Sequence, residues 1–202
     1  MTKYDLLVIG SGPGGQKAAI AAAKLGKRVA IVERGRELVG GVCLHTGTIP
    51  SKTMREAILH LTGYRQREVY AQQYRARKQI TMDQLREKLA HVAGREWDVI
   101  QDQFDRNGVE TIVGEASFAG PHTVEITGRE GTHFVAAEKV LLAPGTKPAR
   151  PAHIPFDGRT VFDSDEFLSL DRIPRSMIVV GGGVIGVEYG LMFATLGVKV
   201  TV

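Results

Sequence analysis

The sequence has 202 residues, 43% of them hydrophobic, and a formal net charge of only +4, which is typical of a soluble globular protein. Its single cysteine excludes an internal disulfide and favours a reducing compartment over secretion. The apolar run at residues 6–9 is too short for a signal peptide or a membrane span, so we expect a cytoplasmic protein with no membrane contact.

The N-terminal segment follows a strand–helix–strand pattern. Residues 6–9 and 29–32 are short continuous apolar runs, which predict two buried strands. An alanine-rich stretch between them predicts a helix over residues 14–25, with Gly26 suited to its C-terminus. This order of elements indicates a βαβ unit of a parallel sheet.

Glycines mark the first turn of this unit with the GxGxxG spacing. Gly10 permits a tight turn, Gly12 lets the backbone approach a pyrophosphate, and Gly15 lets the helix pack close to the strand. The helix N-terminus then offers free N–H groups and a positive dipole end to the phosphates. Glu33 ends the second strand, where it is placed to accept hydrogen bonds from a ribose diol, so we predict a dinucleotide site.

A basic run interleaved with tyrosines lies between residues 55 and 78. Its members are Arg55, Tyr64, Arg65, Arg67, Tyr70, Tyr74, Arg75, Arg77 and Lys78. Such interleaving is found in proteins that bind nucleic acids. Because Glu56 and Glu68 dilute the patch and the net charge is small, we expect a solvated surface and no nucleic-acid partner.

An amphipathic helix is predicted over residues 81–108, with Thr81 as its N-cap and Gly108 at its end. Its apolar residues recur mostly at three- and four-residue steps: Met82, Leu85, Leu89, Val92, Ile100 and Phe104. Short strands are then predicted over residues 109–113, 123–127 and 133–137, as a small antiparallel meander attached to the main sheet.

A further buried strand is predicted over residues 139–143, where the apolar run resumes. Three prolines within residues 147–158 then predict an extended linker. These elements separate the first βαβ unit from a second copy of the same pattern.

That second copy has predicted strands at residues 177–180 and 198–202, with Gly181, Gly183 and Gly186 repeating the GxGxxG spacing. Two such units predict two bound dinucleotides, or one dinucleotide and an unrelated duplicate. Because the sequence stops where the ribose-reading residue should appear, we expect it to be the N-terminal fragment of a longer protein.

The segment GGVCLHTGTIPSK, residues 40–52, resembles the active-site segment of the pyridine nucleotide–disulfide oxidoreductases. The stretches SGPGGQKAAIAAAKLGK, TGTIPSKTMREA and VIGVEYGLMFATLG agree with this resemblance, which covers essentially the whole sequence. It implies an α/β fold: a Rossmann-like FAD-binding domain with an antiparallel β-meander, followed by the start of a second Rossmann-like unit for NAD or NADP.

One departure from the family pattern bears on the reaction. Most members carry two cysteines separated by four residues, whereas here Cys43 holds the first position and Thr48 the second. A threonine hydroxyl can neither form a disulfide nor supply a thiolate to the flavin. The sequence in this respect resembles the flavin-dependent, Si-specific transhydrogenase branch, which implies hydride transfer between NADPH and NAD⁺ through FAD. We expect the fragment alone to be inactive.

The resemblance also implies roles for individual residues. Lys52 is expected beside the reactive nitrogen of the flavin, and Glu188 is expected to pair with it; both are predicted catalytic residues. Pro144 stands where the family usually has threonine, so Ala143 and Gly145 are expected to give backbone contacts only. The expected cofactor contacts, with no metal site, are Gly10, Gly12, Pro13, Gly14, Gly15, Glu33, Gly41, Cys43, Thr48, Lys52, Ala116, Ala143, Gly145, Gly181, Gly183, Val184, Ile185, Gly186 and Glu188.

Two alternatives remain open beside the transhydrogenase. A disulfide reductase of the dihydrolipoamide or mercuric type would act on a disulfide substrate, and Thr48 argues against it. A binding-only module would hold a nucleotide without redox turnover. By motif, residues 1–148 are expected to form the FAD-binding domain, 149–172 a linker and 173–202 the start of the NAD(P)-binding domain, in a homodimer or higher homo-oligomer.

Overall fold

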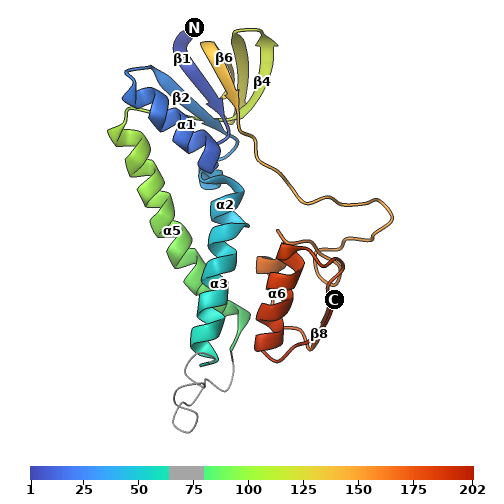
Figure 1. Cartoon of the computed structure of the whole chain (residues 1–202). Helices are drawn as coiled ribbons and strands as arrows, with labels where there is room; N and C mark the ends of the chain where they lie inside the picture. The colour runs from blue at the N-terminus through green and yellow to red at the C-terminus, as the bar shows by residue number, and fades with distance from the viewer. Residues whose placement is uncertain (64–79) are drawn as a thin grey trace. The chain divides into compact units, whose positions relative to one another are not determined.

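In the computed structural model, residues 1–63 and 80–202 are described, and they form two compact units (Figure 1). Unit 1 comprises Met1–His45 and Gly94–Thr146, and unit 2 comprises Thr46–Ala93 and Lys147–Val202. Each unit is therefore built from two separate segments of the chain. Most of the predicted basic run falls in residues 64–79, outside the described residues.

A six-stranded mixed sheet forms the body of unit 1, with the strand order β3-β2-β1-β6-β5-β4. The first four strands in this order pair in parallel, and the last three pair antiparallel as a meander. The strands are β1 (Thr2–Ile9), β2 (Val29–Glu33), β3 (Glu110–Val113), β4 (Glu115–Gly120), β5 (Thr123–Gly128) and β6 (Gly131–Leu142). Helix α1 (Pro13–Lys24) connects β1 to β2 and packs on both strands (Figure 1).

Alternate residues of these strands build the core of unit 1. On β5, Val124 and Ile126 are buried, and on β6, Val135 and Ala137 are buried, as the two-residue period of a strand requires. Tyr4 of β1 lies in the same cluster. Its hydroxyl donates to Glu110 Oε2 at 2.7 Å, and burial together with this carboxylate raises the pKa of Tyr4 to about 12.

Three predictions about the strands are wrong. The expected strands at residues 133–137 and 139–143 are one strand, β6, which pairs with β1 on one side and β5 on the other. Glu138 lies between the two predicted strands, but it is an exposed position of one continuous strand. Its C-terminal end is not buried, since Leu142 is 60% exposed. Strand β4 was not predicted, and β3 pairs with β2 rather than with the meander.

Helix α5 (Met82–Arg106) begins with a reciprocal cap. The Gln84 N–H donates to Thr81 Oγ1 at 3.3 Å, and the Thr81 N–H donates to Gln84 Oε1 at 3.4 Å. Met82, Leu85 and Leu89, predicted to be apolar contacts, are buried in unit 2. Farther along, the Trp97 indole N–H donates to the carbonyl of Arg36, in the short 3-10 helix η1 (Arg36–Leu38) of unit 1.

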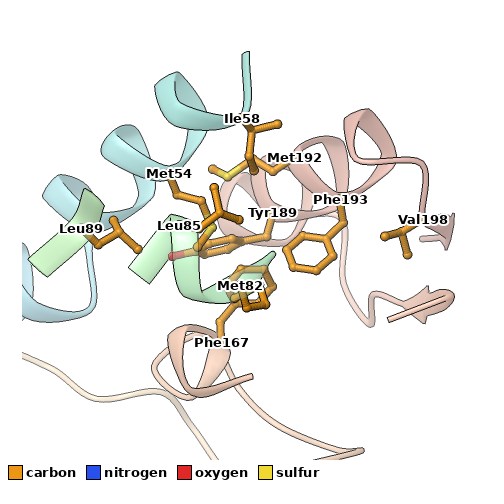
Figure 2. Close-up of a cluster of buried hydrophobic side chains, with 10 residues drawn as sticks. All are labelled: Met54, Ile58, Met82, Leu85, Leu89, Phe167, Tyr189, Met192, Phe193 and Val198. Atoms are coloured by element: carbon orange, nitrogen blue, oxygen red, sulfur yellow. The ribbon is translucent and has the colours of Figure 1, made fainter. Parts of the chain in front are cut away.

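Helices α3 (Thr48–Leu61) and α6 (Val184–Thr195) contact each other in unit 2. Strands β7 (Ser176–Ile178) and β8 (Lys199–Thr201) pair in parallel on either side of α6 in the sequence, so the second βαβ unit is present. Figure 2 shows the core between these helices and the start of α5. Its buried residues are Met54, Ile58, Met82, Leu85, Leu89, Phe167, Tyr189, Met192, Phe193 and Val198.

Residues 149–172 do more than connect elements. They contain the 3-10 helix η2 (Phe167–Ser169), and the Phe167 ring packs on Tyr189 and Phe193 with centroid separations of 4.1 and 4.7 Å. Arg150 pairs with Asp163 and with Glu166, each at 2.7 Å. This segment therefore supplies part of the hydrophobic core of unit 2.

Tyr189 carries a cost within that core. Its hydroxyl is buried and has no hydrogen-bond partner among the residues that the structure describes. A buried hydroxyl without a partner costs about 1–3 kcal/mol. Burial, and then the negative charges of Glu188 and Asp165, raise the pKa of Tyr189 to about 12.

We predict that Tyr189→Phe keeps or raises the free energy of unfolding at neutral pH, by up to about 1 kcal/mol, because it removes the unpaired hydroxyl and keeps the ring. Phe193→Ala, at a fully buried position of the same helix, should lower it by about 3–5 kcal/mol. Chemical denaturation of the three proteins measures both effects. A loss of 2 kcal/mol or more in Tyr189→Phe would mean that the hydroxyl has a partner.

The same variant should change the alkaline response. Between pH 10 and pH 12 the unfolded chain loses the Tyr189 proton while the folded protein keeps it, so the free energy of unfolding falls as the pH rises. The raised pKa of Tyr4 likewise makes the free energy of unfolding fall over this pH range. Denaturation at pH 9, 10 and 11 should therefore show a shallower fall in Tyr189→Phe than in the unsubstituted protein, and equal slopes would contradict the assignment.

Candidate functional site

The first glycine loop is formed by backbone segments that approach too closely for side chains. Gly10 has φ +102°, and a Cβ atom there would lie 2.1 Å from the carbonyl oxygen of Ala143. A Cβ atom on Gly15 would lie 2.0 Å from the carbonyl oxygen of Gly10. The Ala143 N–H also donates to the Ile9 carbonyl at 2.8 Å, so residues after β6 hold the loop that follows β1.

The N-terminus of α1 faces open space. Gly12 is its N-cap residue, no side chain caps it, and its first turn contains no acidic residue. Cβ atoms built on Gly12 and Gly14 would meet nothing within 4 Å. Gly41 approaches Gly12 from another segment, and a Cβ atom on Gly41 would lie 2.9 Å from the Gly12 Cα atom. The exposed N–H groups and the dipole of a twelve-residue helix suit an anionic group at this end.

The Glu33 carboxylate is held from the glycine loop. Ser11 donates to Glu33 Oε2 twice, from its backbone N–H at 3.0 Å and from its hydroxyl at 2.6 Å. The Arg34 N–H donates to Glu33 Oε1 at 3.0 Å. Glu33 thus lies beside the loop, as the βαβ pattern predicts, but already accepts three hydrogen bonds.

The predicted redox segment is divided between the units. Cys43 lies in the short helix α2 (Gly41–His45) of unit 1, where it is a half-buried free thiol. His45 Nε2 lies 2.9 Å from the Val39 carbonyl oxygen, so this imidazole bonds to the backbone. Thr48 begins α3 in unit 2. The sequence carries no second cysteine.

Three more of the predicted cofactor contacts, Ala116, Ala143 and Gly145, lie in the second segment of unit 1. Ala116 is on β4, two residues after Gly114, whose N–H donates to the Glu33 carbonyl at 2.9 Å. The backbone of Ala143, a predicted cofactor contact, lies against Gly10 of the first glycine loop. Gly145 has φ +73° and open space at its Cβ position.

The second glycine loop repeats the geometry of the first within unit 2. Gly181 has φ +109°, and a Cβ atom on Gly186 would lie 2.7 Å from the Gly181 carbonyl oxygen. Gly183 is the N-cap residue of α6, without a side-chain cap and with open space at its Cβ position. Val184 and Ile185, also predicted cofactor contacts, are exposed in the first turn.

Lys52 and Glu188 form an ion pair between α3 and α6 of unit 2. The lysine side chain is 59% exposed and the glutamate side chain 18% exposed. An ion pair this open to water contributes about 0–1 kcal/mol to stability, so the fold does not depend on it. The ion pair instead holds the Lys52 ammonium group, one turn into α3, close to the Glu188 carboxylate, one turn into α6.

The sequence reasoning missed Ser11 as a functional residue. A serine inside the GxGxxG pattern was the available signal, but only the fold shows that it reaches Glu33 and that Gly40 donates its N–H to the serine hydroxyl at 3.1 Å. Within residues 1–63 and 80–202, no three His, Cys, Asp or Glu side chains gather in a group that could hold a metal ion. None of the helices described is long and apolar enough to cross a membrane.

Known proteins resemble this chain over nearly all of its length. A family model for the pyridine nucleotide-disulphide oxidoreductases matches residues 4–202. The soluble pyridine nucleotide transhydrogenase of Mycobacterium bovis is 56% identical over 204 residues, which cover 100% of this chain and 43% of that protein. The protein of the same name from Colwellia psychrerythraea is 41% identical, covering 98% of this chain and 42% of its own length.

Solved structures agree with the family match. LpdA from Mycobacterium tuberculosis superposes with a TM-score of 0.85 at 27% identity, over 99% of this chain and 44% of that one. A Cu(II) complex of the HOCl-induced flavoprotein disulfide reductase RclA from Escherichia coli gives 0.80 at 27% identity, over 99% and 42%. The chain spans less than half the length of the relatives it matches. With a family match over nearly all of its residues and a Rossmann-like α/β fold, this chain belongs to the pyridine nucleotide-disulphide oxidoreductase family.

Proposed function

We propose that the protein containing this chain is an FAD-dependent transhydrogenase that passes hydride from NADPH to NAD⁺ through the flavin. The observation that carries this proposal is the combination of Thr48 at the second cysteine position with the Lys52–Glu188 ion pair. The sequence lacks the disulfide that would accept electrons from the flavin, but it has the Lys52–Glu188 pair, whose ammonium group suits a negatively charged reduced flavin. The names of the relatives from Mycobacterium bovis and Colwellia psychrerythraea support the same reaction.

The residues of unit 1 fit FAD. The open N-terminus of α1 and the backbone of Gly12 and Gly14 would hold the diphosphate, since Cβ atoms built on these two glycines would meet none of the described residues within 4 Å. Glu33 retains acceptor capacity on Oε1 for a ribose hydroxyl, because a carboxylate offers about four lone-pair sites and three are used. Gly41 keeps the segment that carries Cys43 close to the glycine loop.

The residues of unit 2 fit a nicotinamide nucleotide and the charge that hydride transfer creates. Gly181, Gly183 and the uncapped start of α6 would hold the second diphosphate. Bound FAD would supply a carrier that accepts and donates two electrons with a proton. Lys52 would stabilise negative charge on the reduced carrier, and Glu188 would keep the ammonium group oriented.

Disulfide reduction, the activity in the name of RclA, is not favoured for this chain. Such a reaction needs a second thiolate to pass electrons from the flavin to the substrate. Thr48 supplies none, and Cys43 is the only cysteine in the sequence. A homodimer or higher homo-oligomer remains our prediction for the assembly, to be measured by the mass of the purified protein in solution.

The proposed function is tested on the natural protein that contains this chain. Anaerobic NADPH should bleach the flavin without producing a long-wavelength thiolate–flavin band, and a spectrally distinct NAD⁺ analogue should then restore the oxidised spectrum. Steady-state turnover of the two nucleotides without any disulfide substrate should follow. A protein without bound flavin, or one that turns over only with a disulfide, would refute the transhydrogenase.

We predict that Lys52→Met lowers the rate of flavin reduction by about 10²-fold, because a preorganised charge beside developing negative charge is worth about that much. Glu188→Gln should lower it less, since it removes only the partner that orients the ammonium group. Stopped-flow reduction by NADPH measures both rates.

The matched control is Arg55→Met, which removes a cation from the same helix. Arg55 pairs with Glu56 at 2.8 Å, and both side chains are about half exposed. Its rate should stay within about twofold of the unsubstituted protein, as for a surface ion pair of little energetic weight. A Lys52→Met rate equal to the Arg55→Met rate would show that Lys52 has no role in the chemistry.

We further predict that Glu33→Ala releases FAD on dialysis, because a ribose hydroxyl and both Ser11 donors lose their acceptor, at about 1–3 kcal/mol. Glu33→Gln, which keeps an oxygen acceptor, should retain more flavin. The ratio of flavin to protein absorbance after dialysis measures retention. If Glu33→Ala retains as much flavin as the unsubstituted protein, another group holds the ribose.

A further inference from the structure

Ser11 is fully buried, and each of its polar atoms makes a hydrogen bond. Its N–H and its hydroxyl both donate to Glu33 Oε2. Its hydroxyl oxygen accepts from the Gly40 N–H at 3.1 Å, and its carbonyl accepts from Gln16 Nε2 at 2.7 Å. One side chain thus connects the glycine loop, the end of β2 and the segment that leads into α2.

These bonds make the two oxygens of Glu33 inequivalent. Oε2 accepts two hydrogen bonds on the inner side and has no remaining lone pair. Among the residues that the structure describes, Oε1 accepts a hydrogen bond only from the Arg34 N–H, and this bond is exposed to solvent. A ligand hydroxyl can therefore be accepted through Oε1 and not through Oε2.

We propose that Ser11 is the positioning residue of the adenosine ribose site: it fixes Oε2 of Glu33 inward, so that Oε1 is presented to one ribose hydroxyl. The inference rests on the proposed FAD site of unit 1. The short bond from the serine hydroxyl to a carboxylate is charge-assisted, which makes it stronger than a bond between neutral groups. It therefore restricts the rotation of a side chain that would otherwise have to be ordered when the nucleotide binds.

A direct contact between Ser11 and the nucleotide is not required. The serine side chain is inaccessible, and its hydrogen and its oxygen are already engaged by Glu33 and Gly40. Removing the hydroxyl should accordingly weaken binding only through Glu33. This separates a positioning role from a contact with the phosphates, because only the former depends on the ribose hydroxyls.

The test uses calorimetric titration of the flavin-free natural protein with ADP, 2′-deoxy-ADP and 3′-deoxy-ADP. Ser11→Ala should weaken ADP binding about tenfold, within the range expected for loss of a buried hydrogen bond to a charged group. For the analogue that lacks the hydroxyl accepted by Oε1, the two proteins should differ by less than about twofold. In a Glu33→Ala background, which leaves Ser11 no side chain to position, Ser11→Ala should have little further effect on ADP affinity.

Thr62→Val is the matched control. Thr62 is also buried, and its hydroxyl donates to the Ile58 carbonyl at 2.7 Å within unit 2, whereas Glu33 belongs to unit 1. It should lower the melting temperature and leave the affinity for ADP unchanged. If Ser11→Ala fails to fold, Ser11→Cys supplies the same comparison, because a thiol keeps the size but donates weakly.

The outcomes separate the inference from the function on which it rests. If the unsubstituted protein binds neither FAD nor ADP, the proposed flavin site is wrong. If it binds both and Ser11→Ala binds ADP equally well, only the positioning role is wrong. An equal loss for ADP and both deoxy analogues would also overturn it, since Ser11 would then act on the phosphate loop.

Discussion

The close approach of backbone segments at the end of β1 is the constraint on which unit 1 depends. The carbonyl of Ala143 occupies the space that a side chain on Gly10 would need, and the carbonyl of Gly10 occupies the space beside Gly15. Because these positions have no side chains, α1 can begin directly after the carboxyl end of β1 with its first N–H groups free. Hydrogen bonds from Ser11 then hold Glu33 beside the glycine loop, so one compact region contains both the proposed anion site and a carboxylate.

Unit 2 combines an exposed polar pair with an aromatic core. Phe167 packs on Tyr189 and Phe193 of α6 (Figure 2). These contacts, rather than the Lys52–Glu188 ion pair, hold the unit together. An exposed ion pair contributes little to stability, so charge can be placed at this surface with little effect on the fold. Stability and the proposed chemistry are therefore carried by neighbouring residues of the same helix: Glu188 faces Lys52, while Tyr189 lies in the core.

The two nucleotide motifs share their backbone geometry and differ in their side chains. Gly10 and Gly181 have nearly the same φ, and Gly15 and Gly186 each approach the carbonyl of the first glycine of their motif. Only the first motif has a serine after its first glycine, and only there does the described structure show a carboxylate bound to the loop. The repeated glycine motif thus explains the backbone geometry that the two units share. The polar residues Ser11 and Glu33 of the first motif explain how the two candidate sites differ.

The sequence by itself determined the two βαβ units, the amphipathic helix and the missing second cysteine, because glycine spacing, apolar periodicity and composition are local properties. It failed at β6, where one strand was predicted as two with Glu138 between them, since strand pairing depends on partners distant in the sequence. Only the tertiary structure brought Ser11 to Glu33 and Gly40. Hydrogen bonds between residues 22 and 29 positions apart arise from folding and leave no local pattern.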